Sequence, residues 1–387
     1  MRSGFVSILG RPNAGKSTLL NALIGEKIAI VTNKPQTTRN RIQGIVEVPA
    51  RKGRNAAQIV FVDTPGVHRP GSQLDRRMMQ EVYEALESRD IVILLVDAAR
   101  HSELPEVPAP VSAGQALETT PPKKNRSRRA ENESIEDAFV LQLIQKLDCP
   151  VFLVINKIDL VVRATLLPLI ERFSALYSFA EVIPISARKK DGLDGLLMKL
   201  VEYLPKGERY FPKDQFTDQP ERFLVAELIR ERILLETGEE VPYASAVVVE
   251  RFEEPEPVAK PARAGSGAKL PLTRISAVIY CERSGQKAIL IGKGGSKLKS
   301  IGAAARKEIE SLLGTRVYLE LHVIVKENWR ESRYFVDSLD WRKQLEGLAS
   351  GKPRSEEKAD VTQSPPRGKP ARALQKVGTA TPATRAR

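Results

Sequence analysis

The amino-acid sequence predicts an α/β domain with a mostly parallel sheet and helices on both faces, followed by a smaller α+β domain. Three observations support this fold class. Apolar runs of strand length alternate with helical patterns over residues 1–205. After a polar, proline-punctuated linker, the order becomes helix, strand, strand, helix, helix, strand. From residue 346 onward the chain lacks aromatic residues and periodicity, which predicts a disordered basic tail.

These changes of pattern divide the chain into four predicted parts. They are a first domain over 1–205, a linker over 206–219, a second domain over 220–345 and a tail over 346–387. Two insertions interrupt the domains: 101–134, which has five prolines and no aromatic residue, and 253–271, which is rich in Pro, Ala and Gly. We expect the first insertion to be loosely held on the surface.

The elements of each domain follow from apolar periodicity. In the first domain the pattern predicts strands over 5–9, 42–48, 58–63, 91–97, 151–156 and 181–186, and helices over 17–24, 74–88, 134–147, 166–175 and 192–204. In the second domain it predicts a helix around 225–233, strands over 245–252 and 273–280, helices over 286–291 and 296–313, and a strand over 316–325. The continuous aliphatic run 91–97 is typical of a parallel strand buried on both faces.

Composition limits the classes of function. The formal net charge of +13 favours a polyanionic partner, either nucleic acid or an anionic membrane surface. No apolar run approaches the ~20 residues that span a bilayer, and we expect no signal peptide. Cys149 and Cys281 fall in separate predicted domains, as is typical of unpaired thiols in a reducing cytoplasm. Three histidines in distant segments argue against a histidine metal site.

The stretch Gly10–Ser17 has the spacing GxxxxGKS between the first predicted strand and the first helix, which is the context of a P-loop. Backbone N–H groups of the turn and the helix N-terminus would bind the α- and β-phosphates. Lys16 would reach the β- and γ-phosphates, and the Ser17 hydroxyl would ligate Mg²⁺. The alternative is a plain glycine turn, and the flanking strand and helix argue against it.

Asn156-Lys157-Ile158-Asp159 follows a buried strand and predicts that the bound base is guanine. The Asp159 carboxylate can accept from the N1–H and the N2 amino group of guanine, a donor pair that adenine lacks. Asn156 and Lys157 would brace the P-loop and cover the base. Ser186-Ala187-Arg188, after the next strand, would add a backbone donor to guanine O6. A helix-capping loop is the alternative for the first motif.

Two further segments supply candidates for the γ-phosphate and the metal. Asp63-Thr64-Pro65-Gly66 offers an acidic partner for Mg²⁺ and a Gly66 N–H that can meet the γ-phosphate. Thr38 is our candidate for a second hydroxyl on Mg²⁺, in a loop that we expect to be ordered only when the γ-phosphate is present. Spacing does not separate Thr38 from Thr37, and a solvated turn is the alternative for this loop.

The sequence thus yields a complete candidate nucleotide site. We predict catalytic roles for Lys16, Thr38 and Gly66 and metal ligation by Ser17, Thr38 and Asp63. The nucleotide-binding residues would be Gly10, Arg11, Pro12, Asn13, Ala14, Gly15, Lys16, Ser17, Thr18, Asp63, Thr64, Pro65, Gly66, Val67, Asn156, Lys157, Ile158, Asp159, Ser186, Ala187 and Arg188.

A second glycine-rich loop, Gly292–Gly295, joins two predicted helices within the α-β-β-α-α-β order of a type II KH domain. Such a loop clamps a nucleic-acid backbone, and the adjoining groove holds about four nucleotides. A glycine-rich helix break is the alternative. Trp329, after the last strand, is interpreted as a packing residue rather than a base-stacking one. The predicted RNA-binding residues are Ile291, Gly292, Lys293, Gly294, Gly295, Lys297 and Lys299.

The order GxxxxGKS, TT, DTPG, NKxD, SA resembles that of a translation-factor-type GTPase. With the GxxG loop that follows, the chain resembles the Era family of bacterial ribosome-assembly GTPases from about Phe5 to Trp329. The segments Gln36–Arg39, Asp214–Asp218 and Ile291–Gly302 also carry this likeness. The two insertions and the long tail depart from the family pattern.

The resemblance implies a GTP/GDP switch that uses Mg²⁺ and binds the 3′ end of 16S rRNA. It would assist assembly of the 30S ribosomal subunit from the cytoplasm, as a monomer, and we expect no DNA partner. Val67 stands where other GTPases place the glutamine that orients the attacking water, so we expect slow intrinsic hydrolysis. Related GTPases with an asparagine at the Asn13 position can use K⁺ in place of an arginine finger, which makes K⁺ a further candidate cofactor.

Two other hypotheses remain open at this point. The first is a membrane-associated signalling GTPase whose basic surfaces bind anionic lipid, although no amphipathic anchor or lipidation motif supports it. The second is a double-GTPase assembly factor of the Der type, which needs a second P-loop that this chain lacks. The GxxG loop favours the RNA-binding GTPase. For the tail we favour nonspecific, salt-sensitive attraction to RNA or anionic lipid over specific RNA contact.

Overall fold

The first domain is built on a six-stranded sheet with the order β2-β3-β1-β4-β5-β6. The computed structural model describes residues 1–34, 36–50, 55–67, 70–101, 139–238, 241–255 and 271–344. The strands are β1 (Arg2–Gly10), β2 (Ile42–Val48), β3 (Ala57–Asp63), β4 (Ile91–Asp97), β5 (Val151–Asn156) and β6 (Glu181–Pro184). All neighbours pair in parallel except β2 and β3, whose antiparallel register places Ile42 opposite Asp63.

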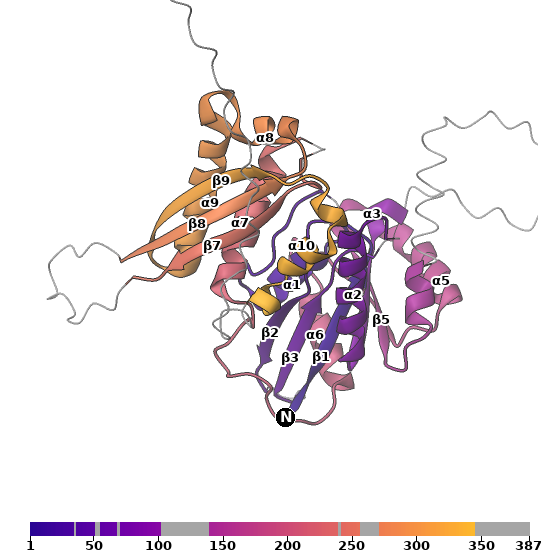
Figure 1. Cartoon of the computed structure of the whole chain (residues 1–387). Coiled ribbons are helices and arrows are strands. Elements are labelled where there is room, and N and C mark those ends of the chain that lie inside the picture. The colour runs from indigo at the N-terminus through magenta and orange to yellow at the C-terminus, as the bar shows by residue number, and fades with distance from the viewer. Residues whose placement is uncertain are drawn as a thin grey trace, which may run out of the picture. The chain divides into compact units, whose positions relative to one another are not determined.

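Helices cover both faces of this sheet (Figure 1). One face carries α1 (Lys16–Ile24) and α6 (Leu193–Tyr203), and the other carries α2 (Gln73–Glu87) and α5 (Leu166–Leu176). Residues 139–144 are also helical, and α3 (Ala98–His101) follows β4 directly. Side chains of one strand alternate between the two cores, so Phe152 of β5 packs on the α6 side and Leu153 on the α5 side. Burial on both faces explains the continuous apolar runs of these strands.

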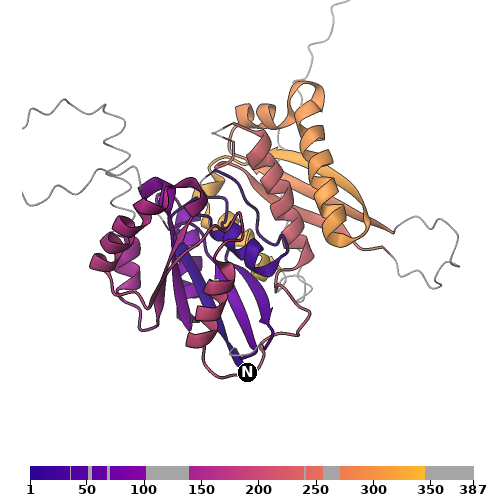
Figure 2. The same ribbon diagram turned by 180° about the vertical axis from the view of Figure 1, so that it is seen from behind.

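The second domain is a three-stranded sheet with helices on one face. The helices are α7 (Glu221–Glu236), α8 (Ser284–Ile291) and α9 (Ser296–Leu313), and the strands are β7 (Ala246–Glu253), β8 (Leu272–Cys281) and β9 (Arg316–Val325). β7 pairs antiparallel with β8, and β8 pairs in parallel with β9. Figure 2 shows α7 and α9 side by side on this sheet. The element order and both sheets confirm the predicted fold class.

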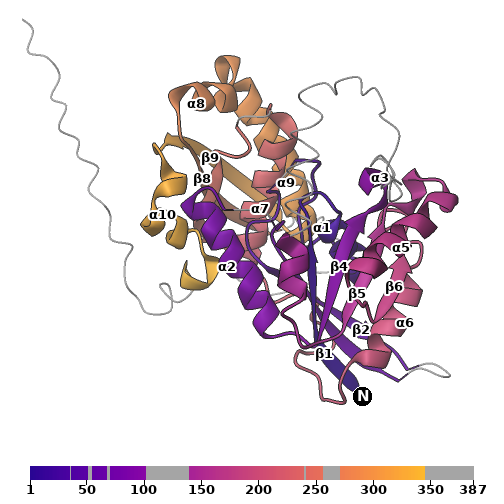
Figure 3. The same cartoon turned by 90° about the vertical axis from the view of Figure 1, so that its right-hand side faces the viewer.

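A short helix that the sequence analysis did not predict, α10 (Arg333–Ser338), lies near the end of the second domain and packs on α2 (Figure 3). Phe335 and Val336 form a small core there with Leu74 and Met78. Trp329 belongs to the same core; it is fully buried and its Nε1–H donates to the Ala244 carbonyl at 2.8 Å. This confirms that Trp329 is a packing residue.

Several predictions lie wholly or partly outside the described residues. They concern most of the two insertions and the whole of the tail, which fall in residues 102–138, 256–270 and 345–387. Both cysteines are free thiols, as predicted, and the structure shows Cys149 half-buried and Cys281 buried. Among the described helices, none combines the length and the apolar character needed to cross a membrane.

Candidate functional site

The P-loop joins β1 to α1 through backbone conformations that favour glycine and asparagine. Gly15 caps α1 in the left-handed region with φ 100°, and Asn13 has φ 64°. A Cβ added at Gly15 would lie 2.3 Å from Nδ2 of Asn156, and one at Gly10 would lie 2.5 Å from the Leu95 carbonyl oxygen. Only glycine fits both positions, and the turn leads directly into the N-terminus of α1, where backbone N–H groups favour an anion.

Lys16 lies buried under this turn. Its Nζ donates to the carbonyls of Gly10 and Arg11, each at 3.0 Å. Burial lowers the pKa of Lys16 to about 8, and the nearby Asp63 carboxylate opposes that shift. The ammonium group is therefore held at the P-loop by two carbonyls at the cost of its desolvation.

Three oxygen-bearing side chains meet beside Lys16. Ser17 Oγ donates to Asp63 Oδ2 at 2.6 Å and lies 2.8 Å from Thr38 Oγ1. Asp63 is fully buried, which raises its pKa to about 6, and its Oδ1 atom has no hydrogen-bond partner among the described residues. A buried, unsatisfied carboxylate oxygen beside two hydroxyls is a donor set that suits Mg²⁺. Thr37, the alternative to Thr38, instead directs its hydroxyl to Thr32 and to the Lys34 carbonyl.

The Asp63–Gly66 segment crosses the P-loop from the end of β3. Thr64 Oγ1 donates to the Ile8 carbonyl at 2.8 Å, and a Cβ added at Gly66 would come within 2.7–2.9 Å of Pro12. Gly66 therefore approaches the P-loop as closely as a residue without a side chain allows. Val67 is fully buried in the core on the α2 side of the sheet. Its apolar side chain has no group with which to orient a water molecule.

The residues expected at the base side come together at the carboxyl ends of β5 and β6. Asn156 Nδ2 donates to the Ala14 carbonyl at 2.9 Å, and Lys157 Nζ donates to the Asn13 carbonyl at 2.9 Å, so both side chains brace the P-loop. Ser186 Oγ donates to Asp159 Oδ1 at 2.7 Å, which orients the carboxylate.

The residues of segment 186–188 differ from one another in their surroundings. The Ala187 N–H, a candidate donor to guanine O6, donates to Asn156 Oδ1 at 3.0 Å, and the Arg188 side chain is exposed. Ile158 packs at the edge of the α5-side core.

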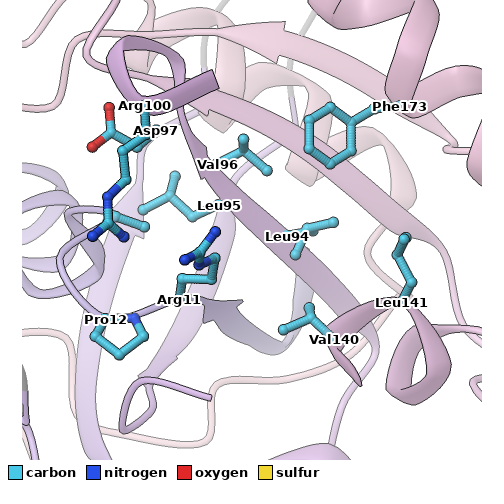
Figure 4. A pocket seen from close by; sticks show the side chains of 11 residues that line it. Arg11, Pro12, Leu94, Leu95, Val96, Asp97, Arg100, Val140, Leu141 and Phe173 are labelled. Carbon is cyan, nitrogen blue, oxygen red and sulfur yellow. The ribbon is translucent and has the colours of Figure 1, made fainter. Parts of the chain in front are cut away.

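Two pockets flank the P-loop. One is lined by P-loop residues, by Gly66 and by the loop that carries Thr38, and it contains the Ser17 and Lys16 side chains. The other is largely apolar and lies between β4, the helical residues 140–141 and α5. Figure 4 shows the polar groups of Arg11, Asp97 and Arg100 at one end of it, and Val140, Leu141 and Phe173 away from them. The sequence analysis did not predict this second pocket.

The GxxG loop of the second domain forms a tight turn between α8 and α9. Gly292, Gly294 and Gly295 all have positive φ, at 72°, 59° and 78°. A Cβ on Gly292 would lie 2.7 Å from Cβ of Lys297, whereas nothing lies within 4 Å of the other two positions. The open side of the loop, with the exposed Lys293, leaves the backbone accessible to a ligand.

The structure adds residues that sequence reasoning missed. Asp97 Oδ2 accepts from Lys157 Nζ at 2.6 Å and so helps to hold the NKxD motif in place. Its position at the carboxyl end of a buried strand was the signal that could have identified it. Arg230 donates to the Thr37 carbonyl, and Arg39, the residue after Thr38, donates to the Ser245 carbonyl; no local pattern indicates contacts between residues so far apart in the chain.

Comparison with known proteins gives consistent matches over both domains. A family model described as a 50S ribosome-binding GTPase matches residues 5–157, and one described as a KH domain matches residues 240–330. The GTPase Era of Syntrophus aciditrophicus is 45% identical over 330 residues, covering 85% of this chain and 91% of that protein. The GTPase Era of Lacticaseibacillus paracasei is 43% identical over 339 residues, covering 88% and 96%.

Two solved structures resemble this chain over nearly their whole length. One is a variant of Aquifex aeolicus Era bound to GDP and AlF4⁻, with 35% identity, a TM-score of 0.69, and coverage of 88% of this chain and 99% of that one. The other is Era in complex with MgGDPNP and nucleotides 1506–1542 of 16S ribosomal RNA, with 36% identity, a TM-score of 0.72 and the same coverage.

Proposed function

Because this chain belongs to the Era family of GTPases, we propose that it is an RNA-binding switch that aids maturation of the small ribosomal subunit. As a GTPase it converts GTP to GDP and phosphate. The proposed RNA target is the 3′ end of 16S rRNA, and the solved Era complex with nucleotides 1506–1542 of that RNA supports it.

The observation that carries the proposal is the convergence of Lys16, Ser17, Asp63 and Thr38 around one end of the P-loop. Ser17, Asp63 and Thr38 come from three separate segments and meet within hydrogen-bond distance, and Lys16 is held beside them by the Gly10 and Arg11 carbonyls. The base-recognition candidates lie at the carboxyl ends of the neighbouring strands, where ligands bind in open α/β sheets. The site therefore offers one place for phosphates and one for a base.

We assign each group a role from its placement. The N–H groups of the P-loop turn bind phosphate oxygens, and Lys16 adds a positive charge where negative charge develops. Ser17, Thr38 and Asp63 would hold Mg²⁺, which supplies charge neutralisation at the β- and γ-phosphates when bound. The Asp159 carboxylate accepts from guanine. Because Val67 does not orient water, intrinsic hydrolysis is slow and rises only with an added group from outside the chain.

For RNA binding we propose a backbone clamp at Gly292–Gly295, assisted by the charges of Lys293, Lys297 and Lys299. Binding of a short RNA that matches the 3′ end of small-subunit rRNA should be tightest with a GTP analogue, weaker with GDP and weakest without nucleotide. The Gly292→Asp, Gly295→Asp variant should lose this binding by tenfold or more, roughly the loss expected when a charge-assisted contact is replaced by repulsion. Titration at fixed salt measures both effects.

The matched control is the Gly25→Asp, Gly314→Asp variant. Both glycines cap helices with positive φ, at 89° and 65°, and a Cβ at either meets nothing within 4 Å, so they share the backbone strain but lie outside the GxxG loop. We expect the control to bind RNA as the wild type does. If RNA binding ignores both nucleotide and the GxxG substitutions, the basic tail is the RNA contact and the clamp is wrong.

We further propose that K⁺ accelerates hydrolysis at the P-loop. Asn13 has a positive φ of 64°, and its side-chain amide donates to the Asn33 carbonyl at 2.8 Å, which holds it between the P-loop and the loop that carries Thr38. We expect faster GTP turnover in KCl than in NaCl at equal ionic strength, with the difference lost in Asn13→Ala. Equal rates in the two salts reject the proposal.

Peripheral attraction to anionic membranes is a separate proposal that rests on the net charge of +13. Sedimentation with vesicles that contain phosphatidylserine, compared with neutral vesicles at the same salt concentration, tests it. No binding to either kind of vesicle would leave RNA as the polyanionic partner.

A further inference from the structure

The loop that carries Thr38 is attached to the KH domain as well as to the nucleotide site. Before Thr38, the Val31 N–H donates to Glu231 Oε1 of α7 at 3.0 Å, and Lys27 Nζ donates to Oε2 of the same carboxylate at 2.5 Å. Lys34 Nζ donates to the Thr237 carbonyl just beyond α7, also at 2.5 Å. The loop therefore follows the C-terminal half of α7 before it reaches the P-loop.

Next to Thr38, α7 contributes an arginine. Arg230 is 2% exposed, and its Nη2 donates to the Thr37 carbonyl, which belongs to the peptide bond between Thr37 and Thr38. The Glu227 carboxylate holds the same guanidinium through bonds of 2.8 and 2.6 Å. A planar guanidinium held at two points has little freedom to follow the loop if the loop moves.

The loop contributes an arginine in return. Arg39, 7% exposed, inserts into the KH domain, where Nη1 donates to the Ser245 carbonyl at 2.6 Å and Nη2 donates to the Pro242 and Tyr243 carbonyls at 3.2 Å each. Its guanidinium also lies 5.7 Å from the ring centre of Trp329. Two arginines therefore join the loop at Thr38 to the KH domain. Arg230 reaches from the KH domain to the loop, and Arg39 reaches from the loop into the KH domain.

Two buried arginines are a costly way to join the loop and the KH domain if packing is their only role. Arg39 and Arg230 are both almost fully buried, so two like charges are kept in a dry environment, and Glu227 is the carboxylate that holds one of them. Apolar side chains would join the two surfaces without that desolvation cost. The hydroxyl that the two arginines flank, Thr38 Oγ1, lies 2.8 Å from Ser17 Oγ and 3.4 Å from Asp63 Oδ2.

We propose that Arg39 and Arg230 form an arginine clamp that positions Thr38 for the GTP-bound state, so that the KH domain supplies a positioning residue to the nucleotide site. The inference rests on the proposed function of that site. It makes preference for GTP over GDP depend on the attachment of the loop to the KH domain. Because the loop contacts Mg²⁺ only together with the γ-phosphate, GDP binding does not need the clamp.

The test is titration of fluorescent GDPNP and fluorescent GDP into the full-length chain at several Mg²⁺ concentrations. Arg230→Gln and Arg39→Gln should each weaken GDPNP binding roughly tenfold, the loss expected for one charged hydrogen bond. Both variants should need more Mg²⁺ for half-maximal GDPNP binding, whereas GDP affinity should change less than twofold. A structural defect alone would weaken both nucleotides together.

Arg232→Gln is the matched control. Arg232 lies on the same helix two residues away and pairs with Glu308, a carboxylate that also pairs with Lys27 at 2.9 Å, so its loss disturbs this face of α7 while the contacts of Arg230 and Arg39 stay in place. Because Arg230→Gln leaves the buried Glu227 without its cation, the same titration is made on the Glu227→Gln, Arg230→Gln variant, which removes both charges together.

Equal losses for GDP and GDPNP, or the same loss of discrimination in Arg232→Gln, would overturn the clamp. Unchanged discrimination in Arg39→Gln and in the double variant would overturn it as well. If the wild type itself binds neither nucleotide, the nucleotide site as proposed is wrong, and the clamp falls with it. The wild-type titration therefore separates failure of the proposed function from failure of the clamp.

Discussion

Replacement of Asp159 by asparagine is expected to weaken GTP binding roughly hundredfold and to admit xanthosine triphosphate. In the proposed site the carboxylate accepts two hydrogen bonds from guanine, and an amide would present a donor to at least one of the guanine donors and leave it unmatched. Xanthine carries a carbonyl oxygen where guanine carries its N2 amino group, and an amide N–H matches it. Ser186 Oγ donates to Asp159 Oδ1 at 2.7 Å and can keep doing so to the amide oxygen, so the side chain should keep its orientation.

Competition between fluorescent GTP and unlabelled GTP, XTP and ATP measures this change. Asp194→Asn is the control, because Asp194 is an exposed residue in the first turn of α6 with the same charge change. We expect it to leave nucleotide choice unchanged. An Asp159→Asn protein that keeps wild-type affinity for GTP would show that the NKxD motif does not read the base here.

Replacement of Lys16 by methionine should reduce GTP hydrolysis by ~100-fold or more, the typical loss when one charged stabiliser of a phosphoryl transition state is removed. Methionine is of similar length and fills the buried space, so the P-loop should keep its form. Single-turnover hydrolysis at saturating GTP separates the chemical step from weaker binding. If the variant hydrolyses GTP at the wild-type rate, Lys16 is not the residue whose charge stabilises the transition state.

The same substitution should raise the stability of the protein without nucleotide at pH 7. Folding lowers the pKa of Lys16 from 10.5 to about 8, so the folded state disfavours the charged lysine. A net shift of that size, which already includes the opposing effect of Asp63, corresponds to a cost of ~3 kcal/mol at pH 7, and the substitution removes it.

The pH dependence of the stability gain in Lys16→Met tests whether burial of the charged lysine is its cause. The cost is full below pH 8, falls as the folded and then the unfolded lysine deprotonates, and vanishes above pH 10.5. Urea unfolding at pH 7 and pH 10.5 should therefore show a gain for Lys16→Met over the wild type that is largest at pH 7. A gain of equal size at both pH values would mean that burial of the charge is not its cause.

Local pattern was enough for much of the fold. The strands predicted over 42–48, 91–97 and 151–156 are β2, β4 and β5 with the same limits, because burial leaves an unbroken or alternating apolar run that ends where the chain turns polar. The strand predicted over 181–186 is shorter, since β6 ends at Pro184, whose missing N–H interrupts the pairing pattern. Helix α10 was missed because six residues are too few to show a helical period.

For the site as well, some features were predicted from the sequence and others were decided only by the structure. Spacing alone predicted the P-loop, the DTPG segment, the NKxD motif and the GxxG loop, because each is a short stretch whose residues act together on one ligand group. The choice between Thr37 and Thr38 was open in the sequence, since both lie in one polar loop. In the structure Thr38 Oγ1 is the hydroxyl beside Ser17 and Asp63.

The sequence by itself therefore determined the family, the order of the two domains and the motifs proposed to bind phosphate, base and RNA. Only the tertiary structure decided how the domains act on one site. The contacts of Arg230 with Thr37 and of Arg39 with Ser245 join residues about two hundred positions apart. Such contacts arise from the packing of two separately folded surfaces, and periodicity and motif spacing report only on neighbours along the chain.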